Sequence, residues 1–420
     1  MDEARALLAD GDVAGALRQL RQDAADAPLP EVAGVVASAA AMVGFDDLRA
    51  AAEALTAAAG PQELYEYGYA CIERGVAFLA VPALEEALAQ LPDEPALLVE
   101  LVAALQHEER HGDVVARLEP RVDDLPPWPF RYLLGRSSLL AGDVRGAAVA
   151  VEAVPPQDDE GAAAALTRLR AALARARTAA TVCPLDRTDL RGWHYVLTGG
   201  VLATLSPYGF DAGMTGRWAF VSDSLGRCRT TLDRVRAILE AADVRPTAVG
   251  LLPDRSSRVL GLAAAQLLDL PAAPLDPQRP DTLVVAYQLD AVDEELLAAL
   301  HEPVPGQVLV EHATCWTDPP LVSADITGFL HQHVDAPWGR QLRVGADGDV
   351  ETGPADDRPT EELAAAIVAA EPDIDPGDGA TPPDPVTVPA ALAAAVRAEW
   401  PRASRGQESS PGPVPSSRFA

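Results

Sequence analysis

The spacing of apolar and polar residues changes along the chain. Through the first 178 residues the pattern is that of short amphipathic helices with almost no strand signal. From about Leu185, short apolar runs alternate with helical segments. "TAVGLLP", "DTLVVAYQL" and "GQVLVEHATCW" predict strands, while "SLGRCRTTLDRVRAILEAA" and "DEELLAALHE" predict helices. This alternation predicts an α/β domain with a mainly parallel sheet and helices on both faces.

The α/β region begins with two apolar runs separated by a glycine pair. The segment is "HYVLTGGVLATL", His194 to Leu205. Gly199 and Gly200 can adopt the positive φ angles of a tight two-residue turn. We therefore expect a β-hairpin here.

A third pattern begins near residue 351. Residues 351–420 hold 12 of the 37 prolines and 12 acidic residues against 5 arginines. "TEELAAAIVAAE" and "VPAALAAAVRAEW" predict short docked helices, whereas "PRASRGQESSPGPVPSSRFA" is typical of disorder. We expect a multidomain chain: a helical domain over 1–178, an α/β domain over 186–350, and an acidic proline-rich tail over 351–420 that is disordered after about residue 401.

Short segments repeat within the helical region. "GDVAGAL" at Gly11 recurs as "GDVRGAA" at Gly142, with a looser copy over 75–92. The spacing resembles that of tetratricopeptide repeats, and the best copy matches the family at Leu64, Gly68, Cys71, Gly75, Ala80, Leu84, Ala87 and Pro92. The resemblance implies an α-solenoid of stacked helical hairpins, with small residues where the helices cross. It also implies a surface that binds a protein or peptide partner.

Composition narrows the choice of partners. The net charge of −30 argues against nucleic acid and against an anionic membrane surface. The chain lacks an apolar run of bilayer length and a basic, apolar signal pattern, and its four cysteines are dispersed, so we expect a cytoplasmic protein. Lysine and asparagine do not occur, which indicates a GC-rich genome and excludes P-loop, protein-kinase and Schiff-base chemistry.

The segment "LLPDRSSRVLG" predicts a strand, a short loop and the start of a helix. Anions bind at helix N-termini, where backbone N–H groups lack partners. The candidate ligand-binding residues are therefore Asp254, Arg255, Ser256, Ser257 and Arg258, with Asp290 after the next strand. The alternative is a plain helix cap, in which Asp254 or Ser256 caps the helix and Arg255 faces water.

The order of these elements is similar to the phosphoribosyltransferase fold, and a Rossmann-like fold shares the alternation. In phosphoribosyltransferases a later strand ends in an acidic pair followed by a Thr-Gly loop. Here Tyr287 and Gln288 stand in place of the acidic pair and no Thr-Gly follows. The resemblance implies a phosphate-containing ligand, and the missing companions put catalysis in doubt.

Two clusters match metal-site patterns in part. "HEERH", His107 to His111, has the zinc-binding H-E-x-x-H spacing, but its charged middle positions favour a solvated helix end. "EHATCW" places His312 and Cys315 near a strand end, where zinc or a Cys–His pair is conceivable. Strand alternation sets the two side chains on opposite faces, which favours a buried thiol and a surface imidazole instead.

Together these observations favour a protein-interaction scaffold or adaptor without a cofactor. In it, the TPR-like solenoid binds a protein partner, and a non-catalytic α/β domain binds a small anionic ligand or a second partner. The alternative is a phosphoribosyltransferase-like or nucleotide-binding enzyme that acts through the α/β domain.

Overall fold

The computed structural model describes the chain except for residues 25, 211–212, 341, 345–349, 378, 380, 382–383, 402–403, 409 and 417–420. The chain forms two compact units, Met1–Pro155 and Pro156–Ala420. The first unit therefore ends nearer to the N-terminus than the expected boundary at residue 178. Helix α11 (Glu160–Ala179) belongs to the second unit, because it packs against α12 (Leu190–Thr198) and α17 (Thr387–Val396).

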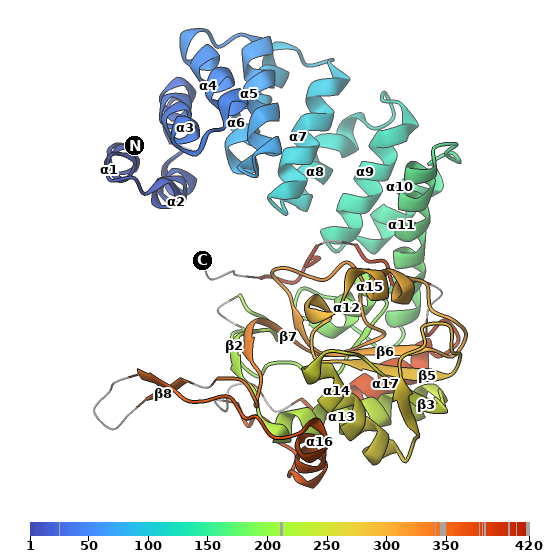
Figure 1. The fold of residues 1–420 in the computed structure, drawn as a ribbon. Helices are drawn as coiled ribbons and strands as arrows, with labels where there is room; N and C mark the ends of the chain where they lie inside the picture. Colours follow the sequence, from blue (N-terminus) through green and yellow to red (C-terminus); the bar gives the residue numbers. More distant parts are fainter. Residues whose placement is uncertain are drawn as a thin grey trace. The chain divides into compact units, whose positions relative to one another are not determined.

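The first unit is a run of paired helices that follow one another in chain order (Figure 1). Consecutive helices pack as antiparallel neighbours, and their apolar side chains share one core that extends from Ala4 to Ala150. This confirms the stacked helix pairs expected from the sequence. The elements are α1 (Asp2–Ala9), α2 (Val13–Asp23), α3 (Leu29–Val43), α4 (Asp46–Ala57), α5 (Pro61–Glu73), α6 (Ala77–Gln90), α7 (Pro95–His107), α8 (His111–Leu118), the 3-10 turn η1 (Glu119–Arg121), α9 (Pro127–Leu140) and α10 (Val144–Glu152).

The repeated "GDV" segment is the turn within a helix pair. Gly11 has a φ of 83° and Gly142 a φ of 96°, values that side chains rarely tolerate. The aspartate that follows caps the next helix: Asp12 accepts a hydrogen bond from the backbone N–H of Gly15, and Asp143 does the same for Gly146. Sequence similarity here thus reflects identical local geometry.

The second unit contains a seven-stranded sheet whose recorded pairings are all parallel. The strand order is β1-β7-β6-β5-β3-β4, and β2 pairs with β7 beyond β1. A separate antiparallel pair joins β8 and β9. The strands are β1 (Val201–Leu202), β2 (Trp218–Ser222), β3 (Ala248–Leu251), β4 (Ala272–Pro274), β5 (Thr282–Ala286), β6 (Val308–Cys315), β7 (Ile326–Asp335), β8 (Leu342–Val344) and β9 (Val350–Thr352).

Helices cover the sheet on both sides, as the alternating pattern predicts. Helices α13 (Leu225–Ala242), α14 (Arg255–Leu268) and α16 (Thr360–Ala369) lie on one side, and α15 (Glu294–His301) lies on the other (Figure 1). A short 3-10 turn, η2 (Leu289–Ala291), follows β5. Every residue of β3 and β5 is buried, because both faces of these strands are covered.

The expected β-hairpin at His194 to Leu205 is wrong. Residues 194–198 belong to α12, which ends at Gly199 with a φ of 74°. The positive φ that suits a hairpin turn also suits the end of a helix, so the glycine pair did not distinguish the two. After the turn, β1 enters the sheet parallel to β7, with Val201 opposite Ile326.

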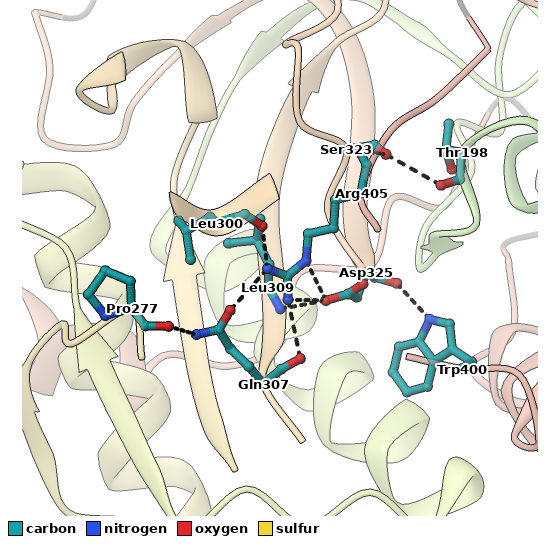
Figure 2. A network of polar contacts seen from close by, with 9 residues as sticks. All are labelled: Thr198, Pro277, Leu300, Gln307, Leu309, Ser323, Asp325, Trp400 and Arg405. Atoms are coloured by element: carbon teal, nitrogen blue, oxygen red, sulfur yellow. Dashed lines mark hydrogen bonds and ion pairs between the residues drawn. The ribbon is translucent and has the colours of Figure 1, made fainter. Parts of the chain in front are cut away.

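The tail contains the two expected short helices, α16 and α17. After residue 401 its described residues are packed, which corrects the expected disorder: Arg405 is 0% exposed and Val414 is 1% exposed. The Arg405 guanidinium donates to Asp325 and to the backbone carbonyls of Leu300 and Gln307 (Figure 2). The composition of this segment did not indicate its packing, because a single buried arginine with all its hydrogen bonds made can order a segment that has no periodic apolar pattern.

Where residues are described, none of the helices combines the length and the apolar character that crossing a membrane requires.

Candidate functional site

Several polar side chains lie at the carboxyl edge of the parallel sheet. Strand β2 ends at Ser222, β3 at Leu251 and β5 at Ala286. In α/β sheets, ligands bind in crevices beyond this edge. The predicted loop at 254–258 and the residues Asp223 and Tyr287 follow directly from these strand ends.

The predicted loop begins α14, and Asp254 is its N-cap. The Asp254 carboxylate accepts a hydrogen bond of 2.8 Å from the backbone N–H of Ser257. The buried hydroxyl of Ser257 in turn accepts the backbone N–H of Tyr287 at 2.9 Å. A carboxylate already occupies the anion position at this helix end, so a phosphate there meets like charge. These contacts match the helix-cap alternative.

The two middle residues of the loop are also engaged within the chain. Arg255 donates to the backbone carbonyls of Asp356 and Arg358, at 2.7 Å and 3.0 Å. The Ser256 hydroxyl accepts a 2.9 Å hydrogen bond from the indole N–H of Trp338. The segment that follows β7 therefore covers the loop, and its polar groups hold that segment in place.

The remaining two candidates do not complete a phosphate site. Arg258 has its closest recorded acidic partner in Glu361, at 3.9 Å. Asp290 is exposed on η2, and its negative charge acts on the buried Glu311 rather than on the loop. The structure thus gives no set of convergent groups among Asp254, Arg258 and Asp290 that resembles an anion cradle.

A different polar cluster lies at the same edge, in the interior. The imidazole Nε2 of His312 is 2.9 Å from Oδ2 of Asp223 and 3.7 Å from Sγ of Cys228. The Cys228 sulfur is 3.5 Å from the same carboxylate oxygen, and the Tyr287 hydroxyl donates to that oxygen at 2.8 Å. We call Asp223, Cys228 and His312 the Asp–Cys–His cluster.

Burial shapes the electrostatics of the Asp–Cys–His cluster, whose three side chains are shielded from solvent. Burial acts to raise the pKa of Asp223, but the charge and hydrogen bond of His312 and the Tyr287 hydroxyl outweigh it, and the pKa lies below its usual value. Burial, followed by the Asp223 charge, raises the pKa of Cys228 well above its usual value. The free thiol therefore stays protonated and is a poor nucleophile.

The apolar pattern of the sequence points to His312 but not to its partners Asp223 and Cys228. Asp223 follows "WAFVS", a strand that the apolar pattern did not reveal, and Cys228 lies in the first turns of α13. A histidine inside the apolar run "VLVEHATC" was the available signal. The Sγ of Cys315, the thiol first considered with His312, instead lies near the Thr317 hydroxyl and the Gln332 carbonyl.

The "HEERH" segment does not form a helical zinc motif. His107 is the last residue of α7 and His111 the first of α8, with Glu109 at a φ of 56° between the helices. The two histidines therefore do not lie one turn apart on one helix. Burial, with a smaller contribution from Arg136, lowers the pKa of His111 to about 4, so this imidazole is neutral and part of the interior.

The first unit carries a surface groove between α4 and α5. Its volume is about 330 Å³, and its wall includes Tyr65 and Tyr69, whose rings stack with centroids 6.3 Å apart. Asp47 and Glu66 also line it, and Arg74 neutralises Asp47 through a hydrogen-bonded ion pair of 2.8 Å. The groove thus combines flat aromatic surface with carboxylates.

Acidic charge extends from this groove along the helices. Tyr65, Tyr69 and Glu73 are spaced four residues apart, so they share one face of α5. Burial and then the charge of Glu73 raise the pKa of Glu100 on α7, and burial and then Glu100 raise the pKa of Tyr65. The negative charge of Glu73 therefore acts on Glu100, and that of Glu100 acts on Tyr65 of the stacked pair.

Comparison of the chain with protein-family models, with curated proteins and with solved structures gives no match.

Proposed function

We propose that the chain is a protein-interaction adaptor whose TPR-like helical unit binds an arginine- or lysine-rich segment of a partner protein. The observation that carries the proposal is the stacked pair Tyr65 and Tyr69 with Glu73 and Glu100 beside it. Tyrosine faces attract guanidinium and ammonium groups, and the adjacent carboxylates add charge-assisted hydrogen bonds.

The charge of the helical unit supports a cationic partner. Residues 1–155 contain 26 acidic residues and 11 arginines. Such an excess raises the rate at which a basic segment meets the surface, and it disfavours acidic partners. The paired helices supply a long, rigid face on which an extended segment can lie.

The α/β domain has no comparable support for a phosphate-containing ligand. Hydrogen bonds within the chain already engage polar groups of Arg255, Ser256 and Ser257. We therefore propose that the partner binds to the helical unit. The contacts of the 254–258 loop do not favour the alternative, a phosphoribosyltransferase-like or nucleotide-binding enzyme.

The test uses the full chain and fluorescein-labelled nona-arginine, with nona-glutamate as the peptide control. The double variant Glu73→Gln, Glu100→Gln removes two charges beside the tyrosines, and the matched double variant Glu119→Gln, Glu152→Gln removes two exposed charges from the same unit. We expect the first pair to weaken nona-arginine binding about tenfold and the second pair to weaken it less than twofold. Equal losses would show that only net charge matters and would overturn the proposal.

A second variant separates the aromatic contribution from charge. Tyr65→Ala with Tyr69→Ala leaves net charge unchanged and removes both ring faces. We expect binding to fall several-fold in fluorescence anisotropy at physiological salt, with Tyr208→Ala, an exposed tyrosine of the second unit, as control. Unchanged binding in the double tyrosine variant would contradict the proposed groove.

A further inference from the structure

We propose that Asp223, Cys228 and His312 bind one zinc ion inside the α/β domain. The proposal does not depend on the function of the helical unit. Cys315 is the cysteine nearest to His312 in the sequence, but in the structure the His312 imidazole faces Cys228 and Asp223 instead.

The three donor atoms already have the spacing of a metal site. Zinc binds sulfur at about 2.3 Å and imidazole nitrogen or carboxylate oxygen at about 2.0–2.2 Å, which separates tetrahedral donors by about 3.3–3.6 Å. The recorded separations are 2.9 Å between His312 and Asp223, 3.5 Å between Cys228 and Asp223, and 3.7 Å between Cys228 and His312. Shifts of a few tenths of an ångström place an ion between them.

The chemistry of the donor set selects zinc over magnesium or calcium. Those two hard ions take oxygen ligands, whereas a thiol, an imidazole and a carboxylate together suit a borderline ion. Binding displaces the Cys228 proton, and the proton that His312 Nε2 donates to Asp223 moves to Nδ1, so that Nε2 is free to bind the ion. The two negative ligands then balance the charge of Zn²⁺. The cluster thereby becomes neutral in an interior where isolated charge is costly.

The surroundings hold the ligands in place. The Tyr287 hydroxyl donates a 2.8 Å hydrogen bond to Oδ2 of Asp223 and so orients that carboxylate. The His312 ring packs between Tyr287 and Phe329, with centroid distances of 5.2 Å and 5.0 Å. Cys228 lies in the first turns of α13, which brings its sulfur to 3.5 Å from the Asp223 carboxylate. Such supporting contacts are a regular feature of protein metal sites.

The experiment measures metal in the full chain produced in zinc-supplemented medium without a metal-affinity step. We expect about one zinc per chain in the unsubstituted protein and in Cys315→Ala, a matched thiol outside the cluster. We expect less than one fifth of that in Cys228→Ala and in His312→Ala. Equal zinc in Cys228→Ala and Cys315→Ala would overturn the proposal.

A second experiment detects the metal by absorption spectroscopy in the unsubstituted chain, so it does not require that any variant folds. In the unsubstituted chain produced with cobalt in place of zinc, a thiolate ligand gives a sulfur-to-cobalt charge-transfer band. We expect this band, and we expect a chelator to remove it and to lower the Tm by several degrees, because a metal that binds only the folded state stabilises it. Absence of the band in cobalt-treated protein, with no change in Tm, would overturn the site even if every cluster variant misfolds.

Discussion

Arg405 and Asp325 form an ion pair in which both side chains are fully buried, with 2.7 Å between Nη2 and Oδ2 (Figure 2). The guanidinium also donates to the backbone carbonyls of Leu300 and Gln307. Asp325 stands just before β7 and Gln307 just before β6. The pair therefore fixes the C-terminal segment to the amino ends of two neighbouring strands, at the edge opposite the Asp–Cys–His cluster.

Removing one partner of this pair is expected to destabilise the protein strongly. Arg405→Ala leaves the Asp325 carboxylate buried without its counter-charge, and breaking such a pair typically costs about 3–5 kcal/mol of unfolding free energy. Urea denaturation measures the loss, with the exposed Arg397→Ala as a control that changes the same charge. Similar midpoints for the two variants would show that the buried pair does not hold the tail.

The helical unit was largely predictable because its packing is local. The crossing of α5 and α6 depends on Gly68 and Leu84, which lie only sixteen positions apart. Each "GDV" turn likewise joins two helices that are consecutive in the chain. Spacing in the sequence therefore maps directly onto contacts. The sheet was predictable in class, because buried parallel strands such as β5 are continuous apolar runs.

The Asp–Cys–His cluster was not predictable from spacing. Asp223 and His312 are 89 residues apart, and they meet only because β2 and β6 both flank β7 in the sheet. The order of strands is a property of the whole fold, and no local pattern encodes it. Arg405 presents the same difficulty, since its partner Asp325 lies 80 residues earlier.

Glu311 is expected to make stability fall as pH rises. Burial in β6 raises its pKa to about 8, whereas the unfolded chain has the usual value near 4.3. The folded state therefore binds the Glu311 proton more tightly than the unfolded state does. This contribution to stability is lost progressively as the pH rises to 8. Unfolding free energies measured between pH 5 and 8 should decline relative to Glu311→Gln, by up to about 1.4 kcal/mol per pH unit. Parallel profiles for the two proteins would contradict this.

His111 is expected to make stability fall as the pH decreases, which is the opposite direction to Glu311. Its pKa falls to about 4 in the folded chain, mainly through burial, against about 6.5 when unfolded. The unfolded state therefore binds the proton more tightly, and stability falls as pH drops from 6.5 towards 4. His111→Gln should show a shallower acid decline than the original chain, whereas His107→Gln, at an exposed histidine four residues earlier, should retain it. The slopes of Tm against pH give the comparison.

Two glycines of the helical unit should respond to alanine in opposite ways. A Cβ added at Gly68 lies 2.6 Å from Cγ of the buried Leu84, closer than van der Waals contact allows. Gly68→Ala should therefore reduce the unfolding free energy by about 1–3 kcal/mol through overpacking. Gly34 lies inside α3, and beyond its own stretch of helix no atom of the described residues lies within 4 Å of the same added carbon. Gly34→Ala should therefore increase stability by about 0.5–1 kcal/mol through helix propensity.

Thermal and urea unfolding of these two variants tests whether the helix pairs cross as closely as the structure indicates. A helical unit with looser crossings would gain stability from both alanines, because the propensity benefit is common to both positions. Opposite signs can arise only if the contact between Gly68 and Leu84 is tight. The sign of the Gly68→Ala effect therefore decides between a close-packed helical pair and a merely helical segment.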